Sequence, residues 1–387
     1  MAQALAGAPV DTAFWGARAF GVAALERELA RLRRAQSAHA RERGHTVARA
    51  SVLNLVVYAD REAHARRAAR SISDLSLRHP SRAIVLLADR GPREGVEGHI
   101  EMHCHLPQPD VSHQVCYEQI LLRARGDSDT RLASAVIPLL VPDLPVFLWW
   151  TGTPPFGRRL FGDLVGLADR LLFDSADLAR PDVLLPAIAR ISDEGRGRYG
   201  LTDLNWTRLT PWREIVALFF DVPAYRPLLD GVTGVRVGFG VDMDGREVHP
   251  SQALLLVGWL ASRLGWRPIE RLAPAEAGGL LFGMERRDGE PVMVRVRPRF
   301  ERGLEEGDVS GVRLQARIGE VSAEFVVKRQ PDPRHVTATT IVNDQRRAER
   351  ILPLPSPDVV ELLGEELSIV GGDRVYEDAL HTLVELV

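Results

Sequence analysis

Apolar and polar residues alternate in blocks along the first half of the chain, and the blocks predict strands that alternate with helices. Apolar runs rich in β-branched residues, bounded by polar sequence, are typical of strands buried on both faces. Such alternation with helical stretches favours an open, mostly parallel sheet with flanking helices. The predicted strands are 51–59, 82–89, 98–106, 145–150 and 170–175, and the predicted helices are 61–77, 130–140, 158–168, 181–192 and 203–221.

The N-terminal region predicts one amphipathic helix over residues 11–43. Leu25, Leu29 and Leu32 follow one another at i, i+4 and i+7, which places them on one helix face. Residues 18–49 also hold eight arginines against three glutamates. This basic helix is either a docking element for an acidic partner or nucleic acid, or a solvated face. The solvated face is the simpler interpretation, because glutamates supply i,i+4 partners.

The second half of the chain has a different pattern. Residues 234–248 predict a strand and a turn, and residues 253–266 predict an apolar helix. Short β-type runs separated by turns follow and suggest an antiparallel meander, and two helices, 357–369 and 373–387, close the chain. The fold class is therefore α/β, with a smaller α+β domain after the open sheet. The predicted divisions are the helix at 1–45, an α/β domain at 46–230 and an α+β domain at 231–387.

Composition narrows the function classes. With 49 basic and 52 acidic residues the formal net charge is −3, which argues against binding nucleic acid mainly by neutralising phosphates. Lys328 is the only lysine and lies outside any G-x-x-x-x-G-K-[ST] loop, so a P-loop nucleotidase is excluded. No G-x-S-x-G, H-E-x-x-H or paired C-x-x-C motif occurs. The sequence therefore offers no recognisable catalytic set.

The sequence also predicts a cytoplasmic protein without a membrane partner. Its N-terminus has no basic segment followed by an apolar one, as a secretory signal would. The longest apolar run, 135–150, holds three prolines and Asp143, and it is shorter than the ~20 residues of a spanning helix. Two cysteines do not make a disulfide framework and fit a reducing compartment.

Histidines and cysteines cluster between residues 103 and 116. In a strand, His103 and His105 point to one side and Cys104 to the other. With His113 and Cys116, the two histidines have the donor atoms of a tetrahedral zinc site, although the spacing matches no strong zinc pattern. Cys104 and Cys116 could instead form a redox pair. Sheet-face histidines and buried thiols are the simpler interpretation.

Tryptophan and arginine gather in two segments of the chain. These residue types dominate hot spots of protein–protein interfaces, and they also serve as core anchors. Phe147, Phe219 and Phe220 accompany them and are expected in the core. Pro211 would kink or split the helix of the second segment. The candidate partner-contact or scaffold positions are Trp149, Trp150, Trp206, Arg208, Trp212 and Arg213.

Four stretches of the chain carry a family resemblance. They are HPSRAIVLL (79–87), PLLVPDLPVFLWW (138–150), TDLNWTRLTPWRE (202–214) and HPSQALLLVGWLASRLGW (249–266). The combinations P-D-x-P…W-W and D-L-x-W-x-R-x-T-x-W-R are specific, because a chance match to both in this order is rare. With them, the sequence resembles the OpcA family over residues 45–270.

The resemblance implies a protein without catalytic residues. OpcA-like proteins are assembly factors and allosteric activators of glucose-6-phosphate dehydrogenase, and they raise oxidative pentose phosphate flux and the supply of NADPH. The resemblance accordingly implies a non-enzyme that binds the dehydrogenase oligomer. No cofactor, nucleic acid or membrane is expected among its partners. The resemblance assigns no role to the His/Cys cluster at residues 103–116.

A ligand-binding enzyme or sensor is the alternative function. Open α/β sheets place ligands at the carboxyl ends of their parallel strands. His79, Ser81 and Arg82 could then hold the phosphate of a sugar phosphate or nucleotide, since arginine offers two parallel donors. The simpler interpretation of these three residues is a helix stop before Pro80, followed by a strand.

Overall fold

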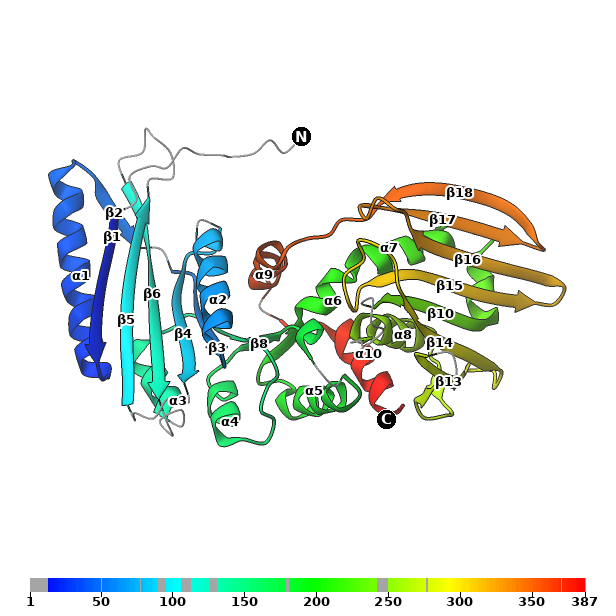
Figure 1. The fold of residues 1–387 in the computed structure, drawn as a ribbon, viewed down its shortest axis with the longest axis horizontal. Helices are drawn as coiled ribbons and strands as arrows, with labels where there is room; N and C mark the ends of the chain where they lie inside the picture. The colour runs from blue at the N-terminus through cyan, green and yellow to red at the C-terminus, as the bar shows by residue number, and fades with distance from the viewer. Residues whose placement is uncertain are drawn as a thin grey trace. The chain divides into compact units, whose positions relative to one another are not determined.

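A computed structural model describes most of the chain, and Figure 1 shows its helices and strands. By their internal contacts the residues form two compact units. Unit 1 comprises Met1–Phe173 and Val359–Gly371, and unit 2 comprises Asp174–Asp358 and Gly372–Val387. The described residues are 13–49, 51–76, 78–89, 95–105, 113–125, 131–178, 181–241, 250–275, 278–369 and 371–386.

This division differs from the predicted boundary near residue 230. The difference has a physical cause in residues 204–221, whose aromatic side chains pack among elements of unit 2. Phe219 and Phe220 lie against Phe325, with ring centroids 5.3 and 4.8 Å apart. This segment therefore belongs to the second unit, although in sequence it continues the strand–helix alternation of the first.

Unit 1 is built on a mostly parallel sheet, which confirms the predicted fold class. Its strands are β1 (Ala13–Phe20), β2 (Thr46–Arg49), β3 (Leu53–Ala59), β4 (Ser81–Asp89), β5 (Gly95–His105), β6 (His113–Arg125), β7 (Val146–Trp150) and β8 (Arg170–Phe173). They follow the order β1-β5-β6-β4-β3-β7-β8, with β2 beside β6. The pairs from β6 through β8 are parallel, and β5 joins β1 and β6 in antiparallel register.

Helices of unit 1 carry the periodic apolar faces that the sequence predicts. The helices are α1 (Val22–Glu42), α2 (Glu62–Leu75), α3 (Leu132–Val136), α4 (Arg159–Val165) and α9 (Val359–Leu367). Leu25, Leu29 and Leu32 are all buried on α1. Helix α9 comes from the C-terminal part of the chain, and a buried ion pair between Arg170 and Glu366 holds it against β8.

Residues 13–20 correct the predicted N-terminal helix. They form strand β1, which pairs with β5 along its whole length. Gly21 follows with φ 83°, a backbone conformation that favours glycine, so the helix begins only at Val22. Strand β6 was not predicted; it pairs antiparallel with the preceding strand β5 and parallel with β4.

Unit 2 combines a second sheet with helices. Its strands are β9 (Gly200–Asp203), β10 (Val232–Gly240), β11 (Arg267–Pro268), β12 (Ala273–Pro274), β13 (Leu280–Glu285), β14 (Pro291–Arg299), β15 (Val309–Ile318), β16 (Val321–Arg329), β17 (His335–Val342) and β18 (Gln345–Pro353). Its helices are α5 (Pro181–Gly195), α6 (Leu204–Arg208), α7 (Thr210–Leu218), α8 (Ser251–Leu264) and α10 (Arg374–Val384). Pro211 lies at the start of α7, so the predicted long helix is split.

The second sheet contains the predicted antiparallel meander, and strand β10 is inserted between β14 and β15. Its order is β11-β13-β14-β10-β15-β16-β17-β18, with β12 beside β13. Strand β10 lies between β14, to which it is parallel, and β15, to which it is antiparallel. Helix α8 is buried along most of its length, lies beside α10 and contacts β10 and β14 (Figure 1). Within the described ranges, no helix is long and apolar enough to cross a bilayer.

Candidate functional site

The first signature segment forms a turn that a buried asparagine fixes. Asn54, in the central strand β3, is fully buried. Its Oδ1 accepts from the Val141 N–H at 2.8 Å, and its Nδ2 donates to the carbonyls of Val141 and Leu144 at 3.0 and 3.2 Å. Between these two residues, Asp143 takes a left-handed φ of 62° and is exposed. The Pro-Asp-Leu-Pro motif is thus a turn fixed from the core of unit 1.

The two tryptophans that end this segment lie in the core of unit 1. Trp149 and Trp150 are 3% and 1% exposed. The ring of Trp150 stacks on Tyr58 with a centroid distance of 4.0 Å and meets the edge of Phe161 at 5.0 Å. Of the two roles open to these tryptophans, the structure supports the scaffold and leaves little surface for partner contact.

The second signature segment begins at a buried carboxyl, Asp203, which caps helix α6. Its Oδ1 accepts from the backbone N–H groups of Asn205 and Ser175, each at 2.9 Å. The Tyr376 hydroxyl donates to its Oδ2 at 3.3 Å. Burial, and then the nearby charge of Asp174, raise the pKa of Asp203 to about 7. The group is therefore close to half protonated at neutral pH.

Trp206 joins the start of α6 to the start of α10. Its Nε1–H donates to Asp373 Oδ2 at 2.7 Å, and Asp373 itself caps α10. The guanidinium of Arg213 lies 3.6 Å from the centroid of the Trp206 ring and donates to the Trp206 carbonyl at 2.9 Å. This stacking combines a cation–π contact with a hydrogen bond, so the two predicted residues stabilise each other.

Arg208 makes a bidentate ion pair on the same helix. Its two Nη atoms donate to the two carboxylate oxygens of Asp174, each at 2.6 Å. Burial lowers the pKa of Arg208, but the hydrogen bonds and charge of Asp174 outweigh this and raise it. Arg208 therefore stays charged and committed to its partner.

A second acidic residue, the half-buried Asp308, lies near this pair. Gln252 donates to Asp308 at 3.0 Å, and Arg329 donates to it at 3.4 Å while its guanidinium lies 5.7 Å from the Trp212 ring centroid. Burial raises the pKa of Asp308. Trp212 itself is 2% exposed. Apart from the buried Oδ1 of Asn205, which has no hydrogen-bond partner among the described residues, the second signature is thus a network of groups that bind one another, which suits a rigid scaffold.

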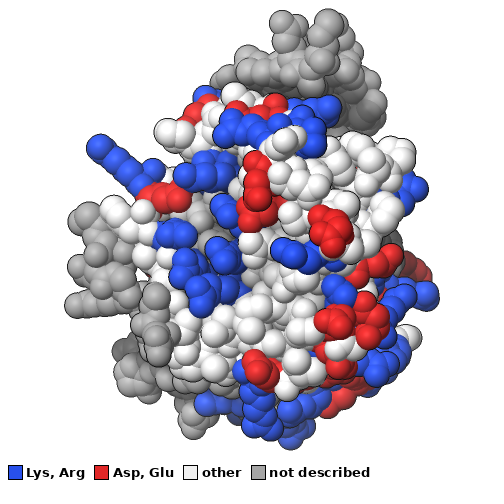
Figure 2. Space-filling model, turned by 90° about the vertical axis from the view of Figure 1, so that its right-hand side faces the viewer, with Lys and Arg blue, Asp and Glu red and all other residues white. Residues whose placement is uncertain are grey.

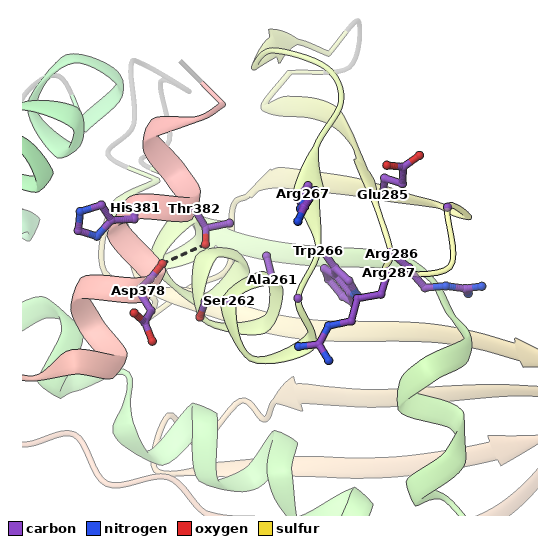
Figure 3. A pocket seen from close by; sticks show the side chains of 12 residues that line it. Ala261, Ser262, Trp266, Arg267, Glu285, Arg286, Arg287, Asp378, His381 and Thr382 are labelled. Atoms are coloured by element: carbon purple, nitrogen blue, oxygen red, sulfur yellow. Dashed lines mark hydrogen bonds between the residues drawn. The ribbon is translucent and has the colours of Figure 1, made fainter.

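An open cavity of about 640 Å³ is present in unit 2 and is drawn in Figure 3. Asp378, His381 and Thr382 of α10 form one wall, and Arg267, Arg286 and Arg287 approach from the opposite side. His381 pairs with Asp193 at 2.9 Å, and Arg286 with Asp288 at 2.6 Å. These pairs leave Arg267 and Arg287 as the groups that could hold an anion.

The residues proposed for a phosphate site lie at the wrong end of their strand. Ser81 and Arg82 begin β4, whereas ligands of open sheets bind at the carboxyl ends. Arg82 is buried, pairs with Glu118 at 2.6 Å and donates to the Leu139 carbonyl at 2.9 Å. Burial lowers the pKa of His79, which disfavours the cation a phosphate needs. The interpretation as a helix stop and strand start agrees with this geometry.

The register of β5 and β6 also corrects the proposed metal site. Cys104 lies directly opposite Cys116, and the two form a disulfide. Cys116 therefore shares the sheet face of Cys104, away from His103, which stacks on Tyr117 with centroids 4.9 Å apart. A disulfide sulfur offers no thiolate to a metal. The side chains of His105 and His113 lie outside the described part, and no described group of three such residues could hold an ion.

Comparison with known proteins identifies the family. Residues 72–190 match a model described as the glucose-6-phosphate dehydrogenase subunit N-terminal domain, and residues 199–380 match the corresponding C-terminal domain. A Nostoc punctiforme protein named "Putative OxPP cycle protein OpcA" is 33% identical over 200 residues, covering 52% of this chain and 41% of that protein. The Synechocystis protein of that name is 25% identical, covering 80% and 64%.

The chain belongs to the OpcA family. It spans less than two thirds of the length of these two OpcA proteins. Among solved structures, D-galactose-1-dehydrogenase from Rhizobium etli has 13% identity and a TM-score of 0.43, covering 87% of this chain and 94% of the other. Myo-inositol 2-dehydrogenase from Lactobacillus plantarum has 10% identity and a TM-score of 0.45, covering 86% and 94%. No activity is inferred from these two similarities.

Several groups of this OpcA-family network were not identified from sequence. Asp373 and Tyr376 lie far along the chain from Trp206, so no local pattern connects them. Asp174 lies inside the predicted strand 170–175, and it directly follows the observed strand β8. Asn54 was hidden inside an apolar run, where a single amide among buried residues indicates a polar group that needs partners.

Proposed function

We propose that this protein is an assembly factor and allosteric activator of glucose-6-phosphate dehydrogenase. One observation carries the proposal: both units match domain models that are described as parts of a glucose-6-phosphate dehydrogenase subunit. In the second signature segment the ionisable groups are engaged with one another. This supports a binding role over a catalytic one. Favouring the active oligomer of the dehydrogenase would raise oxidative pentose phosphate flux and the supply of NADPH.

Activation in this proposal is a difference in binding energy. A protein can shift an enzyme toward its active form only by binding that form more tightly, since equal affinity for both forms shifts nothing. A coupling free energy of ~1–3 kcal/mol would change the affinity for substrate about 5- to 150-fold. By linkage, glucose 6-phosphate must then strengthen the complex by the same factor.

The direct test mixes the protein with the dehydrogenase of its own organism. The initial rate over a range of glucose 6-phosphate concentrations and the mass of the complex by light scattering are measured together. We expect a lower apparent KM and a complex heavier than either component. Product formation by the isolated chain, or two proteins that never co-migrate, would contradict the proposal.

A sugar-phosphate or nucleotide sensor is the second candidate, and the cavity with Arg267 and Arg287 favours it. Thermal unfolding in glucose 6-phosphate, 6-phosphogluconate and NADP distinguishes it, because a ligand that binds only the folded state raises Tm. A rise in Tm of the isolated chain would support the sensor. An unchanged Tm together with stimulation of the dehydrogenase would support the activator.

A further inference from the structure

The second sheet has one buried face and one outer face. Along β14, Val292, Val294 and Val296 are fully buried and point toward the core of unit 2. Residues at the alternate positions point the other way, because successive side chains of a strand leave opposite faces. Met293 is one of them and is 50% exposed. The outer face of the sheet is therefore available to a partner.

Arginines collect on this outer face. Arg295, Arg297 and Arg299 follow at i, i+2 and i+4 on β14, and the register places Arg236 of β10 directly opposite Arg295. We call these four residues the arginine face. Within the described part of the chain, none of the four has an ion-pair or hydrogen-bond partner. Like charges on neighbouring positions of a sheet destabilise it, so the arrangement has a cost in the isolated chain.

Two other arginines of the same sheet, Arg313 and Arg329, are neutralised. Arg313 donates to Glu324 at 3.1 Å, and Arg329 donates to Asp308. At the arginine face the charge of Arg295, together with partial burial and the charges of Arg299 and Arg236, instead lowers the pKa of Arg297. The repulsion is thus concentrated at these positions, where none of the described acidic side chains forms an ion pair with the four arginines.

We propose that the arginine face docks an acidic surface of a protein partner. The inference rests on the proposed function, in which that partner is glucose-6-phosphate dehydrogenase. The surroundings suit a protein interface: Met293 is exposed beside the arginines, and Gly234 and Gly283 lie opposite it on the two neighbouring strands. The side chains of Glu270 and Gln315 lie over Gly283 and Gly234 respectively, and Met and Arg are enriched in protein interfaces.

Charge distinguishes this occupant from a second copy of the chain. A two-fold dimer through this face would bring the same patch against itself and set arginine against arginine, which costs several kcal/mol. On the face drawn in Figure 2, basic and acidic side chains lie interspersed over much of the described surface. Nucleic acid would also present negative charge, but the formal net charge of −3 disfavours it.

The experiment reverses charge on the arginine face. Arg295→Glu/Arg297→Glu is compared with a matched control, Arg347→Glu/Arg350→Glu, which makes the same charge change on exposed residues of the edge strand β18. Affinity for the dehydrogenase is measured by titration at several salt concentrations. We expect about tenfold or greater loss of affinity for the first variant only, and a wild-type complex that weakens as salt rises.

The outcomes separate the two proposals. A wild-type protein that neither binds nor stimulates the dehydrogenase contradicts the proposed function. A wild-type protein that does both, with the Arg295→Glu/Arg297→Glu variant equally effective, contradicts the arginine face alone. Retention of wild type on double-stranded DNA that this variant loses would assign the face to nucleic acid instead. Should the variant fail to fold, a wild-type complex that is insensitive to salt would overturn the inference.

Discussion

Two sets of arginines in unit 2 differ in the groups that their side chains contact. At the second signature, Arg208 is held by Asp174 and Arg213 lies over Trp206, so both guanidinium groups are engaged inside the protein. On the arginine face, Arg295 and Arg297 meet other arginines. The conspicuous tryptophan–arginine motif therefore serves the fold, while the less conspicuous arginines of β14 carry the capacity to bind a partner.

Among changes in the buried network around the second signature segment, we expect the largest effect on the free energy of unfolding at Asp203. Its pKa is about 7 in the folded protein, against ~3.9 in an unfolded chain. Between these values the folded state binds more protons, so the stabilising contribution is full below about pH 4 and is lost as the pH rises through about 7. A shift of about three pKa units corresponds to about 4 kcal/mol.

Asp203→Asn removes this titration. Urea unfolding of both proteins from about pH 4 to about pH 8 should show the wild type losing about 4 kcal/mol relative to the variant over that range. Parallel pH dependences of the two free energies of unfolding would contradict the raised pKa.

The next largest effect is expected at Arg208. Arg208→Met leaves the Asp174 carboxylate half-buried without its bidentate partner and should lower the free energy of unfolding by about 3 kcal/mol. The double variant Asp174→Leu/Arg208→Met removes both charges and should recover part of the loss. If the double variant loses as much as both single variants together, the ion pair does not couple these residues.

A smaller effect is expected at Trp206. Trp206→Phe removes the Nε1–H donor to Asp373 and weakens the contact with Arg213, at a cost of about 1–2 kcal/mol. Trp259→Phe is the matched control, since its half-exposed ring lies on α8 and its indole N–H donates no hydrogen bond to any residue that the structure describes. Equal losses for the two substitutions would show that the hydrogen bond adds nothing.

The smallest effect on stability is expected on the arginine face. Arg295→Gln/Arg297→Gln removes like-charge repulsion, so the free energy of unfolding should stay within about 0.5 kcal/mol of wild type or rise slightly. Thermal unfolding at low salt checks this. A loss as large as that of Arg208→Met would mean that these arginines are structural, and the contrast between the two sets would disappear.

The sequence predicts those features that depend on local spacing. Periodicity located the buried strands 51–59 and 82–89 and the leucine face of α1, and Pro211 marked the split between α6 and α7. Strand β1 was missed because residues 13–20 run directly into the periodic segment of α1, and the pairing with β5 that makes them a strand involves residues far along the chain. Pairing of that kind depends on distant residues and has no local signature.

In the candidate site, too, local motifs were found from the sequence and contacts with distant residues were not. The motif around Trp206 was found from sequence, but its burial and its bond to Asp373, 167 positions away, were not. The arginine face required the register that sets Arg236 opposite Arg295. Spacing along β14 alone places its arginines on one face, and only the tertiary structure shows that no acidic side chain in the described ranges pairs with them.

The most direct test of the central claim is the dissociation constant of the complex with the dehydrogenase, measured with and without saturating glucose 6-phosphate. An allosteric activator predicts that substrate lowers this constant by the same factor by which the protein lowers the dissociation constant of substrate. A dissociation constant that glucose 6-phosphate leaves unchanged would contradict the account, because the protein would then have no effect on the affinity for substrate.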